Sequence, residues 1–235
     1  MKIHLHLLCY NEDDMIGKTL DAYSWVDAVT VWDSYSEDNS REIAISRGCT
    51  VINFGIQGLL DDTAFIKVKN NVAKHSPNAD WIIMADMDEI LFSPTGTRKA
   101  IEDADKAGAT IIRTEGYNMI DDSMPEQLTD CRFGCRASQY DKILAFKKTA
   151  TVAYSMGAHQ ATIQNRIDHE QSLFLLHYKF IGGIERIFAK YQQNASRLSP
   201  LNKRYKWSSH YMQTLEQVQE GINNGRKQLI EVWKI

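Results

Sequence analysis

Three carboxylates follow directly after a short and very apolar stretch of the chain. Residues 81–85 read Trp-Ile-Ile-Met-Ala, and Asp86, Asp88 and Glu89 come next. An apolar run of this length is typical of a central strand that is buried on both faces. Ligands of open α/β sheets bind at the carboxyl ends of such strands. The sequence therefore predicts an acidic cluster at a ligand-binding edge.

A divalent cation is the ligand that this cluster favours. Like charges grouped at one strand end repel each other unless a cation neutralises them, and carboxylate oxygens prefer Mg²⁺ or Mn²⁺ to softer metals. In an extended segment Asp86 and Asp88 point to the same side, so one ion can join both to a diphosphate. An isolated Asp-x-Asp triplet is also common in solvated loops, and it is the position after a buried strand that favours the metal site.

Alternating strand-like and helix-like segments predict how this strand is placed. The strand-like segments are 3–9, 28–32, 49–54, 81–85 and 109–113. The helix-like segments are 15–26, 41–47, 62–75 and 97–107. Repeated alternation over the first 115 residues favours a mostly parallel α/β sheet flanked by helices.

The alternation stops after about residue 115, by the same pattern argument. Three strand-like segments without long helices between them, which predict a mixed sheet edge or small lobe, are 142–148, 150–155 and 172–180. Helix-like segments follow, and the last, marked by apolar residues from Leu215 to Val232, is amphipathic. We expect residues 1–180 to form an α/β domain and residues 181–235 a helical extension packed on it as one structural unit.

Composition is that of an ordinary globular chain. The 235 residues are 43% hydrophobic and 24% charged, with a net charge of −3, which gives no global field to attract a polyanion. No apolar run reaches the length of a signal-peptide core or a membrane span. The four cysteines are few and irregularly placed, so we expect ordinary thiols and a cytoplasmic protein.

A basic and aromatic stretch lies between residues 186 and 207. Its members are Arg186, Lys190, Tyr191, Arg197, Lys203, Arg204, Tyr205, Lys206 and Trp207. Such a stretch is typical of a solvated face, and it also suits a surface for a phosphate-bearing or otherwise anionic acceptor.

Three separate stretches, taken in order, resemble a known family. They are Cys9-Tyr10-Asn11-Glu12, the loop from Asp33 to Ser40, and Lys69-Asn70 followed by residues 81–89. Together they resemble the GT-A-fold glycosyltransferases of the family-2 group and related bacterial sugar transferases, over roughly the first 115 residues. One departure is Tyr35, which stands where the family's loop usually has glycine.

The resemblance implies a GT-A-like fold with a mostly parallel nucleotide-binding sheet, a mixed C-terminal part and C-terminal helices. It implies a glycosyltransferase that uses Mn²⁺ or Mg²⁺ and moves a sugar from a nucleoside-diphosphate sugar, a UDP-sugar first among them. The acceptor would be a hydroxyl of a glycan, a lipid-linked molecule or another compound, with inversion, in surface glycan or lipopolysaccharide assembly. Peripheral membrane contact and a nucleic-acid acceptor stay open.

The resemblance also assigns roles to residues. The donor-binding residues are Tyr10, Asn11, Glu12, Asp33, Lys69, Asp86 and Lys142, with Asp33 on the base. The metal ligands are Asp86 and Asp88, with His159 and His177 as candidates for a further ligand. A histidine in an apolar strand is also typical of a hydrogen-bonded core residue. For the general base we expect a carboxylate, Asp141 first and Asp122 second.

Two other functions use similar ingredients. A nucleotidyltransferase also binds phosphates with acidic residues and a divalent ion, but usually has a Gly-rich loop near the first strand, and residues 9–17 hold one glycine. A catalytically inactive sugar- or nucleotide-binding module could keep the acidic strand end as a relic. We rank both below the glycosyltransferase.

Overall fold

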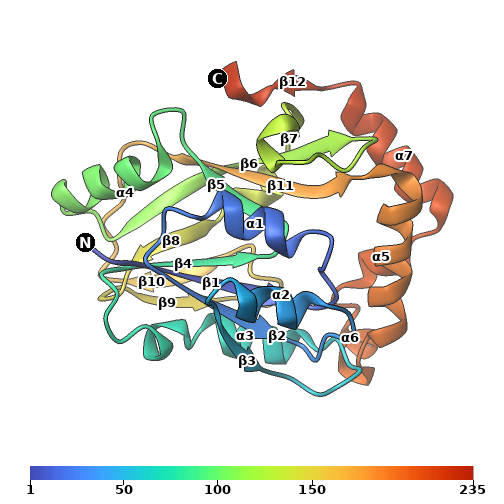
Figure 1. Ribbon diagram of the computed structural model, residues 1–235, viewed down its shortest axis with the longest axis horizontal. Coiled ribbons are helices and arrows are strands. Elements are labelled where there is room, and N and C mark those ends of the chain that lie inside the picture. The colour runs from blue at the N-terminus through green and yellow to red at the C-terminus, as the bar shows by residue number, and fades with distance from the viewer. Residues whose placement is uncertain (235) are drawn as a thin grey trace.

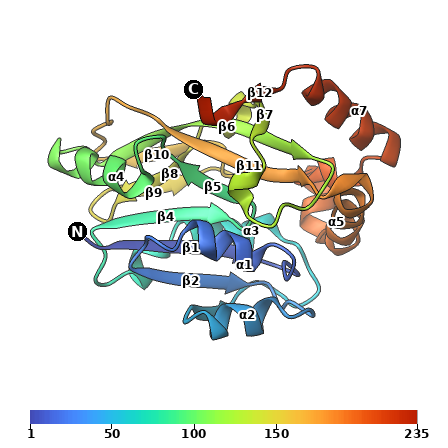
Figure 2. The same cartoon turned by 45° about the horizontal axis from the view of Figure 1, so that its top comes forward.

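The computed structural model describes residues 1–234 and confirms the predicted α/β class, with a mostly parallel central sheet flanked by helices (Figure 1). Its parallel half has the strand order β3-β2-β1-β4. The four strands are β1 (Ile3–Cys9), β2 (Ala28–Asp33), β3 (Thr50–Asn53) and β4 (Trp81–Asp86). Because these strands are parallel, their carboxyl ends meet at one edge of the sheet (Figure 2).

β4 is buried on both faces, as its apolar run predicted. Residues 81–85 are 0% exposed. Trp81, Ile83 and Ala85 pack into the core on one face, whereas Ile82 and Met84 pack into the core on the other, as the alternation of a strand requires.

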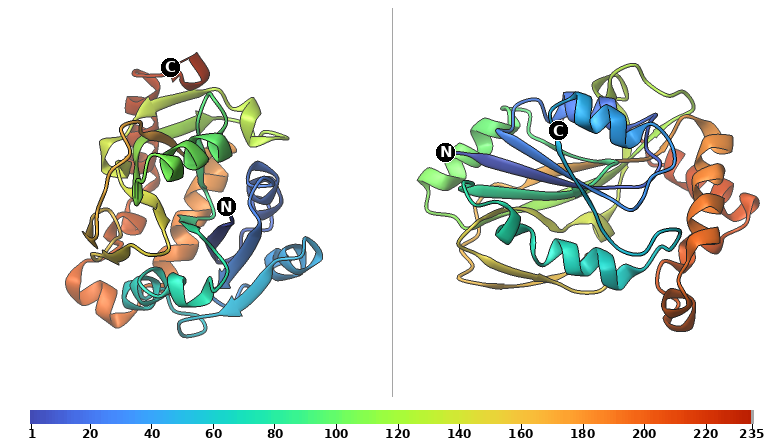
Figure 3. Two further views of the ribbon diagram at one scale, coloured as in Figure 1. Left: turned by 90° about the vertical axis from the view of Figure 1, so that its left-hand side faces the viewer. Right: turned by 60° about the horizontal axis from the view of Figure 1, so that its bottom comes forward.

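Helices cover both faces of this half of the sheet (Figure 3). α1 (Ile16–Ala22), α2 (Ser40–Ser46) and α4 (Thr97–Lys106) contribute apolar side chains to the first core. α3 (Asp62–Lys69) and the short 3-10 helix η1 (Val72–His75) contribute to the second. The predicted helix over 62–75 is therefore two pieces, because Asn70 turns its side-chain amide to the backbone of Tyr154.

The rest of the sheet is mixed, as predicted. β8 (Ile143–Lys147) lies antiparallel between β4 and β6 (Ile111–Asp121), and β7 (Phe133–Arg136) is antiparallel to β6. β11 (Leu173–Ile181) is parallel to β6 and antiparallel to β5 (Glu89–Phe92). β9 (Thr151–Tyr154) and β10 (Ala161–Gln164) form a separate two-stranded sheet. Two 3-10 turns connect these strands, η2 (Leu128–Asp130) and η3 (Ser138–Tyr140).

The C-terminal segments lie beside the carboxyl edge of the sheet (Figure 1). They are α5 (Gly183–Arg197), α6 (Pro200–Tyr205), the 3-10 helix η4 (Ser209–Met212) and α7 (Leu215–Arg226). The helix expected to reach Val232 ends at Arg226, because the chain returns to the sheet as β12 (Ile230–Glu231), which pairs with β7 and leads into η5 (Val232–Lys234). Within residues 1–234, no helix combines the length and apolarity needed to cross a bilayer.

Candidate functional site

A cavity of about 520 Å³ lies where the carboxyl ends of β1, β4 and β11 face α5, α6 and η4. The strand ends contribute Tyr10, residues 86–89 and residues 177–179 to its wall. Residues 206–211 line the opposite side. This volume is typical of a small-molecule site, and the position is the ligand edge of an α/β sheet.

Charged side chains line much of this cavity. The seven cations are Lys69, Lys142, Lys179, Arg186, Lys190, Arg197 and Lys206. The five carboxylates are Glu12, Asp62, Asp86, Asp88 and Glu89. The chain carries a net charge of −3, but its cavity wall has an excess of two formal positive charges and so favours an anionic ligand.

Two lysines neutralise part of the acidic strand end. Lys69 Nζ donates to Asp86 Oδ1 at 2.8 Å, and Lys142 Nζ donates to Glu89 Oε1 in an ion pair whose side chains are 4% and 1% exposed. Burial would raise the pKa of Asp86, but Lys69 and Lys142 hold that pKa below its usual value. Lysines of the chain itself therefore supply positive charge that the sequence had suggested a metal ion would supply.

Asp88 is paired with His177. His177 Nε2 lies 3.3 Å from Asp88 Oδ2, because β11 pairs with β5 in a register that sets His177 opposite Glu89. His177 Nδ1 lies 2.9 Å from Asn118 Oδ1, an amide oxygen that accepts its proton and so directs Nε2 toward Asp88. Burial would raise the pKa of Asp88, but His177 lowers it well below its usual value.

The predicted four-residue metal site needs correction. In the part of the chain that the structure describes, no three His, Cys, Asp or Glu side chains converge as a metal site. Asp86 is paired with Lys69, and His159 lines the cavity but its Nδ1 donates to the backbone oxygen of Gln139 at 2.8 Å. Asp88 and His177 remain as two adjacent candidate metal ligands. Asn118 orients His177 by a hydrogen bond to Nδ1, as is typical of a metal-binding histidine. They fit a Mg²⁺ or Mn²⁺ ion that takes its remaining ligands from phosphate and water.

The residues expected to bind the donor fall into two groups. Those that line the cavity are Tyr10, Glu12, Lys69, Asp86 and Lys142. Asn11 and Asp33 do not line it. Asp33 is 2% exposed and accepts from the backbone nitrogen and hydroxyl of Ser36 at 3.0 and 2.6 Å, while Asn11 Oδ1 accepts from the backbone nitrogen of Glu37 at 2.7 Å. Both side chains thus fix the loop after β2 against the end of β1.

The departure at Tyr35 has a conformational meaning. Tyr35 has φ of 60°, in the left-handed region that glycine adopts without steric cost. The loop therefore adopts at position 35 a conformation that would suit glycine, with a tyrosine in that place.

The two carboxylates expected as general base lie outside the cavity. Asp141 Oδ2 is 2.6 Å from Arg136, and its Oδ1 accepts from the backbone nitrogen of Gly116 at 2.9 Å. The Asp122 side chain is 76% exposed and pairs with Arg226. A general base must reach the hydroxyl that it deprotonates, so this placement corrects the prediction for both residues.

Glu12 is the cavity carboxylate with an unusual proton affinity. Burial raises its pKa to about 7, although Lys190 from α5 lies 3.2 Å away and lowers it. From the sequence we expected only a donor-binding role for Glu12, because the desolvation of a side chain depends on which segments cover it.

The basic and aromatic stretch divides between the two interpretations that it allowed. The members that line the cavity are Arg186, Lys190, Tyr191, Arg197, Lys206 and Trp207, whereas Lys203, Arg204 and Tyr205 do not. At one end of the cavity the Arg197 guanidinium stacks 3.0 Å from the centre of the Tyr10 ring, and its Nη2 donates to Ser34 Oγ at 3.0 Å.

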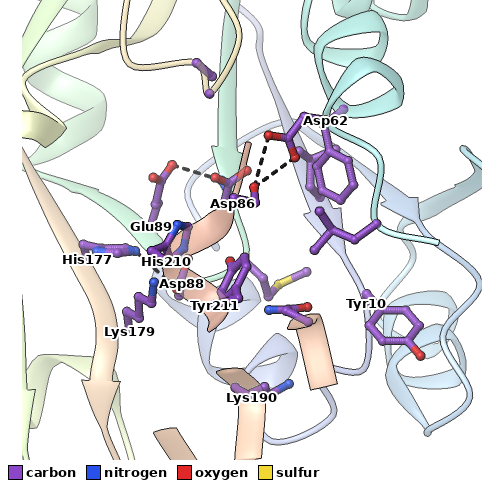
Figure 4. Close-up of a pocket in the computed structure, with 18 of the residues that line it drawn as sticks. Tyr10, Asp62, Asp86, Asp88, Glu89, His177, Lys179, Lys190, His210 and Tyr211 are labelled. Carbon is purple, nitrogen blue, oxygen red and sulfur yellow. Dashed lines mark hydrogen bonds and ion pairs between the residues drawn. The ribbon is translucent and has the colours of Figure 1, made fainter. Parts of the chain in front are cut away.

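Other cavity residues had only weak signals in the sequence. Lys179 stands two residues after His177 in β11, and its Nζ lies 4.6 and 5.0 Å from the ring centres of Tyr191 and Tyr211. His210 also lines the cavity, and its ring lies 6.1 Å from that of Tyr191. Figure 4 shows Lys179, His177 and Asp88 grouped at one side of the cavity and Tyr10 at the other.

Asp62 fastens the segment that covers the cavity. Its Oδ1 accepts from Asn202 Nδ2 and from Ser208 Oγ, each at 3.0 Å, and its backbone nitrogen donates to Asn202 Oδ1 at 3.1 Å. Asn202 is 0% exposed. These bonds, of which those from Ser208 to Asp62 are drawn in Figure 4, tie α6 and the residues after it to the start of α3.

No protein-family model matches the chain, and no curated protein matches it in sequence. Among solved structures it is similar to glucosyl-3-phosphoglycerate synthase from Mycobacterium tuberculosis in complex with Mn²⁺, UDP and glucosyl-3-phosphoglycerate, with 21% identity and a TM-score of 0.35, over 49% of this chain and 44% of that one. The structure of the same enzyme with Mg²⁺ and UDP has 19% identity and a TM-score of 0.36, over 49% of this chain and 43% of that one. A further structure, of a mycobacterial protein, has 21% identity and a TM-score of 0.35, over 50% of this chain and 41% of that one. The chain spans less than half the length of each of these proteins.

Proposed function

We propose that this chain is a metal-dependent glycosyltransferase that moves a sugar from a nucleoside-diphosphate sugar, with UDP as the nucleotide, to an acceptor hydroxyl. The observation that carries the proposal is the Asp88 and His177 pair, with its donor atoms 3.3 Å apart at the ligand edge of the sheet. This pair lies in a cavity whose wall is cationic and whose volume suits a small molecule. The resemblance of the first 115 residues to GT-A-fold enzymes supports the same function.

Cleavage of the bond between sugar and phosphate builds negative charge on the departing nucleoside diphosphate. A divalent ion held by Asp88 and His177 would supply positive charge next to those oxygens. Asp86 and Glu89 hold the ammonium groups of Lys69 and Lys142 in the same part of the cavity. These lysines are fixed before the donor arrives, so little reorganisation is needed when charge develops.

Transfer with inversion needs a base that takes the proton of the acceptor hydroxyl. We assign this role to Glu12, a cavity carboxylate whose pKa of about 7 lets it accept a proton near neutral pH. Replacement Glu12→Gln should lower kcat for transfer by about 10²- to 10⁴-fold, the usual contribution of a general base. Unchanged transfer by this variant would remove Glu12 from the mechanism, and NMR of the product anomer checks inversion.

The C-terminal segments complete the site in this proposal. Residues 1–180 supply the strand ends, and the segment after residue 180 supplies the opposite wall through Lys190, Arg197 and residues 206–211. The resemblance to bacterial sugar transferases extends the proposal to acceptors of surface glycan or lipopolysaccharide assembly.

A donor-hydrolysis panel tests the proposal directly. UDP-, GDP- and CDP-sugars are incubated with the protein and Mn²⁺, and the released nucleotide is measured for the wild type, Asp88→Asn and Asp122→Asn. We expect hydrolysis of a UDP-sugar that Asp88→Asn abolishes and that Asp122→Asn, on the exposed side chain outside the cavity, leaves intact. Turnover that persists in Asp88→Asn would defeat the metal assignment, and no nucleotide binding at all would defeat the proposed function.

A further inference from the structure

Lys179 is a cavity cation that has no carboxylate within 4.0 Å among residues 1–234. Within residues 1–234, the cavity cations that have a carboxylate within 4.0 Å are Lys69, Lys142, Arg186 and Lys190. Lys206 is solvent-exposed, and Arg197 donates to Ser34 Oγ and stacks on the Tyr10 ring. Lys179 Nζ, by contrast, makes no hydrogen bond or ion pair with another described side chain or backbone atom.

Aromatic rings hold the Lys179 ammonium in place. Its Nζ lies 4.6 Å from the centre of the Tyr191 ring on α5 and 5.0 Å from that of Tyr211 on η4. Cation–π contacts offset part of the cost of removing the ammonium from water, but they accept none of its three N–H bonds in the way that an oxygen does. A positioned cation with unused donors is suited to bind an oxyanion.

The position of Lys179 places such an oxyanion near the reacting centre and away from the nucleoside. Lys179 follows His177 by two residues in β11, and both side chains line the cavity. Figure 4 shows Lys179 beside His177 and Asp88, with Tyr10 on the other side of the cavity, and the Arg197 guanidinium stacks on the Tyr10 ring. An anion at Lys179 would therefore belong to the acceptor rather than to the base or ribose of the donor.

The charge of the cavity agrees with an anionic acceptor. Its wall carries an excess of two positive charges, and the divalent ion of the proposed function raises this excess to four. The diphosphate of a nucleotide sugar neutralises about two of these positive charges, and a phosphate monoester carries a charge of about −1.5 to −2 at pH 7. A phosphate-bearing acceptor thus brings the formal charge of the filled cavity close to zero, whereas a neutral acceptor leaves an excess of two formal positive charges.

We propose that Lys179, held by Tyr191 and Tyr211, binds the phosphate group of a phosphate-bearing acceptor whose hydroxyl receives the sugar. This inference rests on the proposed function, because both the charge of the filled cavity and the orientation of the acceptor depend on a metal-bound nucleotide at Asp88.

The test uses inorganic phosphate as the probe. Phosphate is titrated into full-length protein that has been saturated with UDP and Mg²⁺, and its Kd is measured by calorimetry for the wild type, Lys179→Gln, Lys179→Arg and Lys203→Gln. Lys203 is an exposed lysine of α6 that does not line the cavity, so it is the matched control. We expect saturable phosphate binding that weakens about tenfold in Lys179→Gln, as loss of one charge-assisted hydrogen bond predicts, and that Lys179→Arg and Lys203→Gln largely keep.

The possible failures are distinguishable. If UDP and Mg²⁺ do not bind the wild type, the proposed function fails and this inference fails with it. If they bind but phosphate does not, or if Lys179→Gln binds phosphate as well as the wild type, the proposed function stands and the phosphate site at Lys179 is overturned. Thermal unfolding of each variant identifies a loss of fold. If Lys179→Gln does not fold, the phosphate affinity of Lys179→Arg, which keeps the positive charge, decides the result: affinity like that of the wild type supports the site, and lost affinity overturns it.

Discussion

His177 Nε2 lies 3.3 Å from Asp88 Oδ2, although 89 residues separate the two along the chain. The register between β11 and β5 brings them together, and Asn118 on β6 fixes the histidine tautomer through Nδ1. The proximity of His177 and Asp88 cannot be predicted from residue type or local spacing, yet the proposed chemistry depends on it.

A substitution at Asn118 tests that relationship without changing Asp88 or His177 themselves. Asn118→Ala should weaken Mn²⁺ binding to the UDP complex by about 10- to 100-fold, the usual effect of removing the hydrogen-bond partner of a metal-binding histidine. Calorimetric titration of Mn²⁺ measures this loss, and Asn118→Asp, which keeps an acceptor for Nδ1, should restore much of the affinity. Equal Mn²⁺ affinity in the wild type and Asn118→Ala would show that His177 is not a ligand.

The buried Glu89 and Lys142 pair should dominate local stability. Lys142→Met leaves a carboxylate that is 1% exposed without its ammonium, which should lower the free energy of unfolding by about 3–5 kcal/mol. Urea denaturation measures the change. The control is Lys99→Met, which breaks an exposed surface pair with Asp103 and should lower the free energy of unfolding far less. Similar losses in the two variants would contradict the burial of the Glu89 and Lys142 pair.

Glu12 should give stability a distinctive pH dependence. Its pKa rises from an ordinary value of 4.5 to about 7 on folding, so the native state binds this proton more tightly than the unfolded state. The contribution of Glu12 to stability is therefore largest below pH 4.5 and is lost as the pH rises through 7. Glu12→Gln should remove this loss, so its Tm should improve relative to the wild type between pH 5 and pH 8.

Melting curves at both pH values, without added metal, measure this difference. Glu220→Gln, on an exposed residue of α7, provides the control and should track the wild type at both values. A wild type and Glu12→Gln pair whose Tm difference is the same at pH 5 and pH 8 would refute the raised pKa.

Asp62 should control how firmly the C-terminal segment covers the cavity. Asp62→Ala removes the acceptor for Asn202 Nδ2 and Ser208 Oγ, and an unsatisfied buried amide costs about 1–3 kcal/mol. We expect faster amide hydrogen exchange over residues 199–211, as local opening becomes easier. The exposed Glu170→Ala serves as the comparison, and identical exchange in both variants would show that Asp62 does not hold the segment.

Local patterns were sufficient for the first half of the fold. The apolar run at 81–85 predicted a strand with both faces buried, and the alternation over the first 115 residues predicted the parallel sheet and its helices. They were insufficient for the C-terminus, where the last helix ends at Arg226 because residues 230–231 pair with β7. That pairing is a long-range contact, and local periodicity carries no record of it.

The candidate site shows the same division. The acidic strand end indicated a cavity, and Tyr10, Glu12, Lys69 and Asp86 do line it. The sequence could not show that Lys69 and Lys142 would neutralise Asp86 and Glu89, since their proximity depends on how α3 and β8 pack beside β4. Asp141 and Asp122 were plausible bases by type alone, and their partners Arg136 and Arg226 hold them outside the cavity.

The sequence by itself determined the buried strand and the edge at which its carboxylates emerge, and it predicted the divalent cation that such an edge favours. Tertiary structure alone decided which carboxylate pairs with a histidine, which are matched by lysines, and that Lys179 lies against Tyr191 and Tyr211 with no carboxylate of the described chain within 4.0 Å. The physical reason is that hydrophobic periodicity acts over neighbouring residues, whereas the charge balance and proton affinity of a cavity are set by segments far apart in the chain that fold around it.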